Sequence, residues 1–204
     1  MLIVLTPPKM LRYEARAIMA LLDAGADFIH LRKPGYSSDE LQQFLKDIPV
    51  AYRGRLSVHY HHRVGREAGL GGLHESGSYR VEGHCALRQS RSCHSLTEAA
   101  ALPSHFRYAF LSPIFNSISK EGHRAAFKND ELRHFLQSRP PLSPPLVALG
   151  GVHVGNVPHV QELGFGGAAL LGAVWRLESS GVDLRGTVQN FSEIQALWKK
   201  RSSF

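Results

Sequence analysis

The sequence is poor in cysteine and has no hydrophobic run of membrane-spanning length. Its two cysteines, Cys85 and Cys93, fit neither a metal-binding nor a redox spacing. Two isolated cysteines are typical of a reducing compartment, so we expect a cytoplasmic protein without a disulfide. A transmembrane helix needs about 20 consecutive apolar residues, and no stretch approaches that length, so we expect no membrane partner. The apolar start Met1–Thr6 is too short for a signal peptide and predicts a first strand.

Acidic residues are also scarce relative to basic ones. Lys and Arg number 24 against 17 Asp and Glu, which gives a net charge of +7. A nucleic-acid-binding domain gathers its basic residues on one stripe, whereas here only the tail Lys199–Arg201 is clustered, so nucleic acid is not an expected partner. Dispersed positive charge instead favours anionic metabolites entering a cleft. The chain of 204 residues, 43% of them hydrophobic, can bury one core, so we predict a single domain over residues 1–204 and leave open whether it forms a homo-oligomer.

Apolar runs that predict strands alternate with amphipathic segments that predict helices. The predicted strands are Leu2–Thr6, Asp27–Arg32, Arg55–Tyr60, Gly72–His74, Leu87–Ser92, Tyr108–Ser112, Leu146–Leu149 and Gly167–Leu171. The predicted helices are Tyr13–Ala24, Ser38–Asp47, Val64–Ala68, Leu96–Ala101, Asp130–Ser138, Val154–Leu163 and a long piece within Asp183–Lys200. Strands that alternate with helices pair in parallel, and eight of them imply closure, so we predict an α/β protein with the (β/α)8 or TIM barrel fold. A flavodoxin-like open sheet would leave several strands unexplained. The fourth unit is the weakest, because Glu75–Gly83 contains no good helix.

Two glycine-rich stretches near the end of the chain are the most informative feature. Pro145–Val152 and Gly164–Trp175 each predict a buried strand, a glycine turn and a helix start. Glycines at such turns let backbone N–H groups approach an anion closely, and in a (β/α)8 barrel a phosphate site commonly lies after strands 7 and 8. The sequence therefore indicates a phosphorylated small molecule, bound at Gly150, Gly151 and Gly172.

Other polar residues follow the predicted strands at their carboxyl ends, where barrel enzymes carry their active sites. They are His30, Arg32 and Lys33, then His59, His61 and His62, then His74 and Glu75, Ser92 and His94, and finally Ser112 through Lys120. This set is rich in basic side chains and hydroxyls and poor in carboxylates, so it favours an anionic substrate. His59, His61 and His62 alternate as a strand would present them, so a transition metal is an alternative to plain rim histidines. His74 is interpreted as a core histidine.

The order of these motifs resembles one family, the thiamine phosphate synthase and TenI group, over essentially the whole chain. Ala24–Arg32 ends in His-Leu-Arg, similar to that family's Gln-Leu-Arg-x-Lys strand. The further matching stretches are Arg63–His74, Ser92–Ala99 (Ser-x-His-x-x-x-Glu-Ala), Ser112–Lys120 (Gly-Pro-Ile-Phe-x-Thr-x-Thr-Lys in the family), Pro145–Val152 and Gly166–Val174. Each match alone is weak, but together, in one order and at strand ends, they are specific.

The resemblance implies a transferase of thiamine biosynthesis that couples hydroxymethylpyrimidine pyrophosphate to hydroxyethylthiazole phosphate. It implies that Arg32 and Lys120 hold the pyrophosphate, with Ser117 and Ser119 where threonines bind phosphate oxygens. It places Ser92 facing the pyrophosphate, and the Gly150–Gly151 backbone on the thiazole phosphate. His30 and Lys33 belong to the same predicted substrate-binding set, and His61 and His62 to the catalytic set.

The sequence departs from the family in the part of the site that implies Mg²⁺. The family's Asn-Asp pair aligns with His61–His62, its other magnesium aspartate falls near Tyr79, and its lysine aligns with Pro34. Mg²⁺ prefers hard oxygen ligands, so histidines replace those ligands poorly. We therefore predict no metal ligands, and a synthase activity that is slow or depends weakly on Mg²⁺.

Two other functions fit the same residues. A TenI-type thiazole tautomerase shares the barrel and uses proton transfer, with His61, His62 or His74 as the base. Ser112–Pro113 speaks against it, because such tautomerases carry a Gly-His pair there. The second alternative is a non-catalytic protein that binds thiamine precursors.

Overall fold

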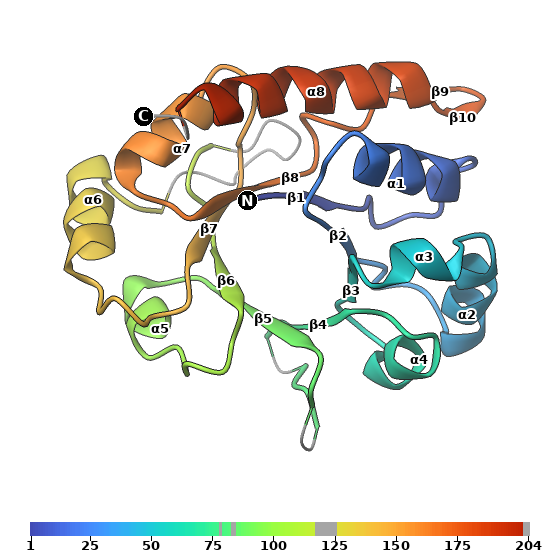
Figure 1. Cartoon of the computed structure of the whole chain (residues 1–204), viewed down its shortest axis with the longest axis horizontal. Coiled ribbons are helices and arrows are strands. Elements are labelled where there is room, and N and C mark those ends of the chain that lie inside the picture. The colour runs from blue at the N-terminus through green and yellow to red at the C-terminus, as the bar shows by residue number, and fades with distance from the viewer. Residues whose placement is uncertain (78, 83–84, 117–125, 202–204) are drawn as a thin grey trace.

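The computed structural model describes residues 1–77, 79–82, 85–116 and 126–201, and its strands close into a barrel (Figure 1). All eight barrel strands are parallel, and β1 pairs with both β2 and β8. The barrel strands are β1 (Leu2–Leu5), β2 (Phe28–Leu31), β3 (Leu56–Val58), β4 (Gly72–Glu75), β5 (Arg88–Cys93), β6 (Tyr108–Leu111), β7 (Leu146–Leu149) and β8 (Gly167–Leu170). This closure confirms the predicted (β/α)8 barrel and excludes the open sheet.

Helices surround the strands as an outer ring (Figure 1). They are α1 (Glu14–Asp23), α2 (Ser38–Lys46), α3 (Val50–Arg53), α4 (His62–Glu67), α5 (Leu96–Ala100), α6 (Asn129–Ser138), α7 (Val157–Leu163) and α8 (Leu184–Arg201). Their ends follow local rules: Ser37 and Glu40 form a capping box at the start of α2, and Gly164 ends α7 with a φ of 98°. No described helix is long and apolar enough to cross a membrane.

Two parts of the chain differ from the sequence prediction, and a third agrees with it. The short helix α3 was not predicted, because its four residues carry no amphipathic pattern and bury none of their side chains. The second glycine stretch is not followed at once by a helix: one turn leads into the hairpin of β9 (Leu177–Glu178) and β10 (Gly181–Val182), and α8 begins only at Leu184. Between β4 and β5, the described residues form no helix, as expected.

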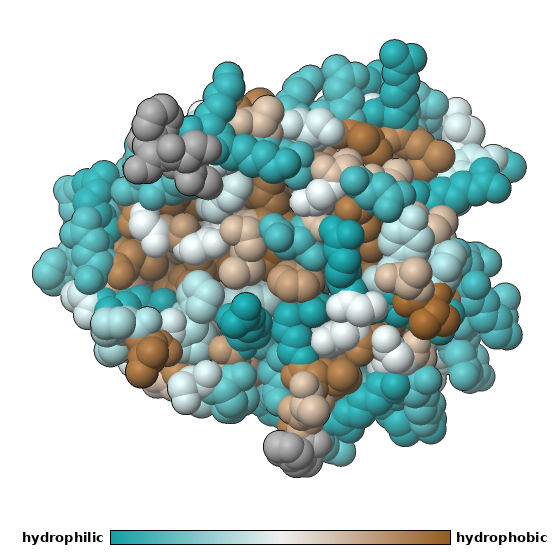
Figure 2. Space-filling model, in the orientation of Figure 1, coloured by the Kyte–Doolittle hydropathy of each residue, from teal (hydrophilic) through white to brown (hydrophobic). Residues whose placement is uncertain are grey.

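Two hydrophobic regions hold the barrel together. The larger one lies between the strands and the helices and includes Ile18, Leu31 and Phe191, each fully buried. The smaller one lies among residues of β1, β6, β7 and β8, and includes Phe110 and Val147. Strands buried on both faces read as continuous apolar runs, which explains sequences such as LIVL in β1 and LVAL in β7. Figure 2 shows mostly hydrophilic side chains along the outer rim, as expected for solvent-facing helices.

The barrel interior is polar on its other side. Residues of β2 to β6 place polar side chains there, namely His30, His59, His74, Ser90, Ser92 and Tyr108. Barrel interiors are usually filled with branched apolar side chains, so three buried histidines in one layer are unusual. Both cysteines are free, in agreement with the sequence prediction.

Candidate active site at the carboxyl end of the barrel

A cavity of about 400 Å³ lies where the strands end, a size typical of small-molecule sites. Every barrel strand or the loop after it contributes to its wall. Taken from β1 to β8, representative lining residues are Leu5, Arg32, His59, Ser76, His94, Pro113, Gly150 and Gly172. The structure thus brings together five of the predicted site residues at this cavity: Arg32, Ser92, Gly150, Gly151 and Gly172.

The turn after β7 takes a conformation that requires glycine. Gly150 and Gly151 have φ values of 100° and 66°, which residues with a side chain adopt at a cost. A Cβ atom on Gly151 would lie 2.9 Å from Cβ of Phe115. The backbone N–H groups of Gly151 and Gly172 donate no hydrogen bond to any described residue. These amides are therefore available to an anion.

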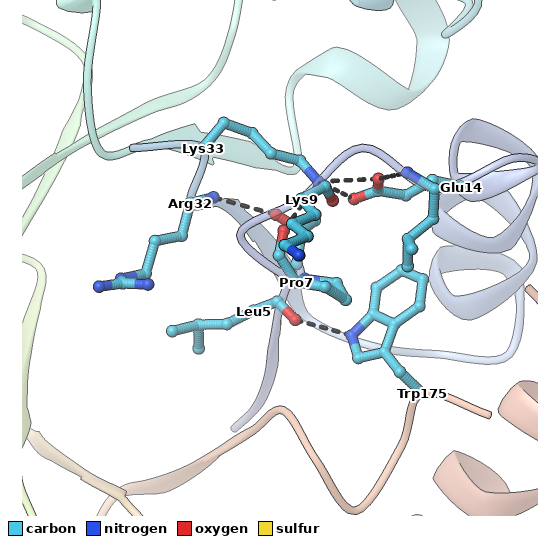
Figure 3. Close-up of polar contacts among 9 residues, drawn as sticks. Leu5, Pro7, Lys9, Glu14, Arg32, Lys33 and Trp175 are labelled. Atoms are coloured by element: carbon cyan, nitrogen blue, oxygen red, sulfur yellow. Dashed lines mark hydrogen bonds and ion pairs between the residues drawn. The ribbon is translucent and has the colours of Figure 1, made fainter. Parts of the chain in front are cut away.

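The turn after β8 is fixed by a tryptophan. Trp175 is 8% exposed, and its indole Nε1–H donates a 2.7 Å hydrogen bond to the carbonyl of Leu5 at the end of β1 (Figure 3). The backbone N–H groups of Val174 and Trp175 both donate to the carbonyl of Leu171. This single turn, tied to β1, holds Gly172 at the cavity wall and directs the chain into the β9–β10 hairpin.

Arg32 follows β2 and presents its guanidinium to the cavity. Its backbone N–H donates to Thr6 Oγ1 at 3.0 Å, while no described residue bonds its guanidinium. Figure 3 shows the guanidinium extending away from the neighbouring lysine. A half-buried guanidinium that the described part of the chain leaves without a partner is well suited to bind a phosphate or pyrophosphate group.

Lys33, the next residue, is fully engaged by the protein (Figure 3). Its side chain is 2% exposed, and its ammonium contacts the Glu14 carboxylate at 2.5 Å and 2.7 Å. The ammonium also donates to the carbonyls of Pro7 at 2.8 Å and Lys9 at 2.9 Å. An ammonium has three N–H donors, and all are used here, so none is left for a substrate. Burial raises the pKa of Glu14, which the attraction to Lys33 opposes.

Three histidines form one buried cluster below the cavity. His30 Nδ1 lies 3.0 Å from His59 Nε2, and His30 Nε2 lies 2.6 Å from the Tyr108 hydroxyl. The His74 ring lies between two serines, with Nδ1 2.8 Å from Ser90 Oγ and Nε2 2.9 Å from Ser92 Oγ. His30 was predicted to bind substrate, and it lies beneath the cavity with no exposed surface.

Burial keeps the imidazoles of this cluster neutral. Desolvation lowers the pKa of His74 to about 3 and holds the pKa values of His30 and His59 well below 6.5, with smaller contributions from neighbouring charges. His59 is 3% exposed and borders the cavity. The core interpretation of His74 agrees with its position, although its ring belongs to a polar network.

His61 and His62 are held by the protein backbone. The His61 ring donates from Nε2 to the Tyr36 carbonyl at 2.6 Å, and its Nδ1 lies 3.0 Å from Ser38 Oγ. His62 donates from Nε2 to the His74 carbonyl at 3.0 Å. Tyr79 packs edge-on against the His62 ring, with centroids 5.1 Å apart. The structure therefore places neither histidine among the residues lining the described cavity.

Three predicted residues, Ser117, Ser119 and Lys120, lie outside the described residues. His94 was predicted at the carboxyl end of its strand but was given no role; it lines the cavity, with its Nδ1 3.2 Å from Ser112 Oγ. Two other polar residues, Glu14 and Tyr108, were not in the predicted set. They could not have been identified, because their polar partners lie far away in the sequence.

The residues present do not fit a magnesium ion. No carboxylate of a described residue lines the cavity. Glu75 is 5% exposed, and its carboxylate already receives Arg91 at 2.8 Å and the Val81 amide at 2.9 Å. Mg²⁺ binds through carboxylates and water and dehydrates reluctantly, so this set of neutral imidazoles and engaged acids is a poor site for it.

Fold and cavity together define a (β/α)8 barrel protein with a small-molecule-sized cavity at the carboxyl ends of its strands, lined by the Arg32 guanidinium and the glycine turns after β7 and β8. The chain matches the thiamine monophosphate synthase family over residues 2–174. It therefore belongs to this family, whose thiamine-phosphate synthases are transferases.

Individual relatives agree with this assignment. The chain is 28% identical to a thiamine-phosphate synthase of Neisseria meningitidis serogroup A over 188 residues, 87% of each protein. A solved thiamine phosphate pyrophosphorylase from Bacteroides thetaiotaomicron is 30% identical, with a TM-score of 0.81 over 97% of both chains. A second one, from Pyrococcus furiosus, is 20% identical with a TM-score of 0.77 over 98% of this chain and 95% of its own, and supports the fold alone.

Proposed function

We propose that the protein couples hydroxymethylpyrimidine pyrophosphate to hydroxyethylthiazole phosphate to give thiamine phosphate and pyrophosphate. The observation that carries this proposal is a cavity lined both by the Arg32 guanidinium, which has no partner among the described residues, and by the Gly150–Gly151 turn. Two anion-binding elements facing one cavity suit a reaction between two phosphorylated substrates.

In this reaction the bond between the pyrimidine methylene carbon and the pyrophosphate oxygen breaks, and its electron pair leaves with the pyrophosphate. The thiazole nitrogen then donates its lone pair to the methylene carbon. Negative charge grows on the departing oxygen, so a cation fixed beside it lowers the barrier. We assign that role to Arg32, with Lys120 as the second cation implied by the family resemblance.

The thiazole substrate would occupy the opposite half of the cavity. Its phosphate would accept hydrogen bonds from the amides of Gly151 and Gly172, which have no described partner. Apolar side chains from β1, β7 and β8 line this half, among them Leu5, Leu149 and Leu171, and suit an uncharged ring. Ser92 and His94 border the space between the two halves.

This reaction would run without a dedicated magnesium ion. The protein offers Arg32 and neutral imidazoles where carboxylates would be needed for Mg²⁺. If a metal contributed about 4 kcal/mol to leaving-group departure, its loss would slow the reaction about a thousandfold, so we expect slow turnover.

The experiment is a coupling assay with both purified substrates, in which thiamine phosphate is measured in metal-depleted buffer and at increasing Mg²⁺. We expect product in both, with little response to Mg²⁺. Arg32→Gln should lose about 10- to 100-fold in kcat/KM, equivalent to about 1.5–3 kcal/mol for a charged hydrogen bond. The control is Arg107→Gln, an exposed arginine before β6, which should retain activity. No product under any condition would refute the proposed function.

The tautomerase remains the second candidate, because His94 lies at the cavity beside Ser112 and offers an imidazole for proton transfer. His61, His62 and His74, the bases first considered, have their rings engaged by backbone or serine oxygens. Isomerisation of the thiazole in the same samples, without coupling, would favour this function. Binding of both precursors without turnover would favour a non-catalytic protein.

A further inference from the structure

We propose that His30, His59 and His74 form a binding site for a borderline divalent transition metal such as Zn²⁺ or Co²⁺ at the floor of the cavity. The three residues each offer a ring nitrogen, and these atoms all lie within 4.8 Å of one another. They come from the ends of the neighbouring strands β2, β3 and β4, whose parallel pairing sets their spacing. This site is separate from the family's magnesium site and does not depend on the proposed coupling reaction.

The spacing of the rings suits one metal ion for two of the three pairs. Two imidazoles on a tetrahedral metal with Zn–N bonds of about 2.05 Å have ring centroids about 5.2 Å apart. The His30–His59 and His30–His74 centroids are 5.1 Å and 5.2 Å apart. His59 and His74 are stacked at 4.0 Å, so they must separate by about 1 Å. His59 borders the cavity and therefore has space to move.

Two of the three rings, those of His30 and His74, have the oxygen partner that a metal-bound histidine needs. A metal-bound histidine usually donates its second ring N–H to a fixed oxygen, which sets the tautomer and the orientation. His30 Nε2 faces the Tyr108 hydroxyl at 2.6 Å, and His74 Nδ1 faces Ser90 Oγ at 2.8 Å. His30 Nδ1 and His74 Nε2 then carry the lone pairs for a metal.

The protonation state of the cluster suits a divalent transition metal that binds neutral nitrogen ligands. Burial keeps all three imidazoles unprotonated at neutral pH, the form that binds metal. Imidazole suits Zn²⁺, Co²⁺ and Ni²⁺, whereas Mg²⁺ and Ca²⁺ prefer oxygen. The Arg32 charge opposes a cation and weakens the site, but its guanidinium is half-exposed and screened by solvent. Three histidines leave the fourth position open on the cavity side for water or a substrate oxygen.

The test is Co²⁺ binding to the full chain without a polyhistidine tag, followed by visible absorption and equilibrium dialysis. We expect about one Co²⁺ per chain with the intense visible bands of tetrahedral coordination, and displacement by Zn²⁺. His30→Gln, His59→Gln and His74→Gln should each weaken binding by more than about 100-fold, and the conservative Tyr108→Phe by about 10-fold. His105→Gln, at an exposed histidine, is the control and should bind like wild type.

A second measurement avoids variants that fail to fold. Co²⁺ is paramagnetic, so in the wild-type protein it should shift and broaden the ring resonances of His30, His59 and His74 and leave that of His105 in place. Absence of Co²⁺ binding by the wild-type protein would overturn the proposal and leave the cluster as a hydrogen-bond network complete in itself. Binding that all three variants retain, or that shifts His105 instead, would also overturn it.

Discussion

The buried ion pair between Lys33 and Glu14 leads to a prediction about folding rather than catalysis. We expect Lys33→Met to lower the free energy of unfolding by about 3–5 kcal/mol, because it leaves a buried carboxylate without its cation. The Glu14 side chain has no exposed surface, and the Lys33 ammonium also holds the carbonyls of Pro7 and Lys9. The total stability of a domain is about 5–15 kcal/mol, so this loss is a large part of it.

The magnitude is best measured as a double-mutant cycle by urea denaturation, followed by circular dichroism. Glu14→Leu alone should also destabilise, since it leaves a buried ammonium with carbonyl partners only. The double variant Lys33→Met/Glu14→Leu should be more stable than either single variant, because well-packed apolar side chains replace buried ion pairs at little cost. A matched control is Arg63→Met, which removes an exposed i,i+4 pair with Glu67 and should change stability by less than about 1 kcal/mol.

The same variants separate two roles for Lys33. If its ammonium serves only the fold, the double variant should bind pyrophosphate as tightly as wild type. The reasoning would be refuted if Lys33→Met changed stability by less than about 1 kcal/mol, or if the stable double variant lost pyrophosphate binding.

Further predictions concern the histidine cluster, the glycine turn and the missing magnesium site. With chelator present, the free energy of unfolding should fall as the pH drops below about 6.5, because the unfolded chain binds protons that the buried histidines exclude in the folded chain. Each excluded proton contributes about 1.4 kcal/mol per pH unit, and for His74 this loss continues down to its folded pKa of about 3. Denaturation at several pH values measures this slope, and His74→Gln should make it shallower. Gly151→Ala should lower the free energy of unfolding by about 1–2 kcal/mol or more, since the φ of Gly151 is 66° and a Cβ there would lie 2.9 Å from a neighbouring side-chain carbon. The same change should weaken thiazole phosphate binding in calorimetry. Gly35→Ala is the control, because a Cβ at Gly35 lies in open space, and it should change neither stability nor binding. The double change His61→Asn/His62→Asp should create a response of coupling activity to Mg²⁺, and an unchanged Mg²⁺ titration would count against the ligand argument.

The strands could be predicted from the sequence because both of their faces are buried. A continuous apolar run such as LVAL in β7 fits a strand that is buried on both faces, and all eight predicted strands are present. Glycine turns were also predictable, since few other residues accept the φ of Gly150 or Gly151. The barrel then places every strand end at one rim, which is why Arg32 and Ser92 could be assigned to the same site.

Side-chain partnerships could not be predicted, because they join residues distant in sequence. Nothing near Lys33 in the sequence indicates that its ammonium forms an ion pair with Glu14 on α1. The sequence therefore could not distinguish a substrate-binding lysine from a structural one. His30 likewise was assigned to the rim, whereas its alternation within β2 points it into the barrel toward Tyr108, 78 positions away. Successive side chains on a strand point to opposite faces, so an assignment that is wrong by one residue places a side chain on the wrong side of the strand.

The measurement that tests the central claim most directly is pyrophosphate release by the wild-type protein with both substrates in metal-depleted buffer, with Arg32→Gln and Arg107→Gln alongside. The account predicts slow, steady release that matches thiamine phosphate formation, changes little when Mg²⁺ is added, and falls about 10- to 100-fold in Arg32→Gln only. Release that requires added Mg²⁺, or release that Arg32→Gln leaves unchanged, would contradict the claim that this chain's own cations replace the magnesium half of the site.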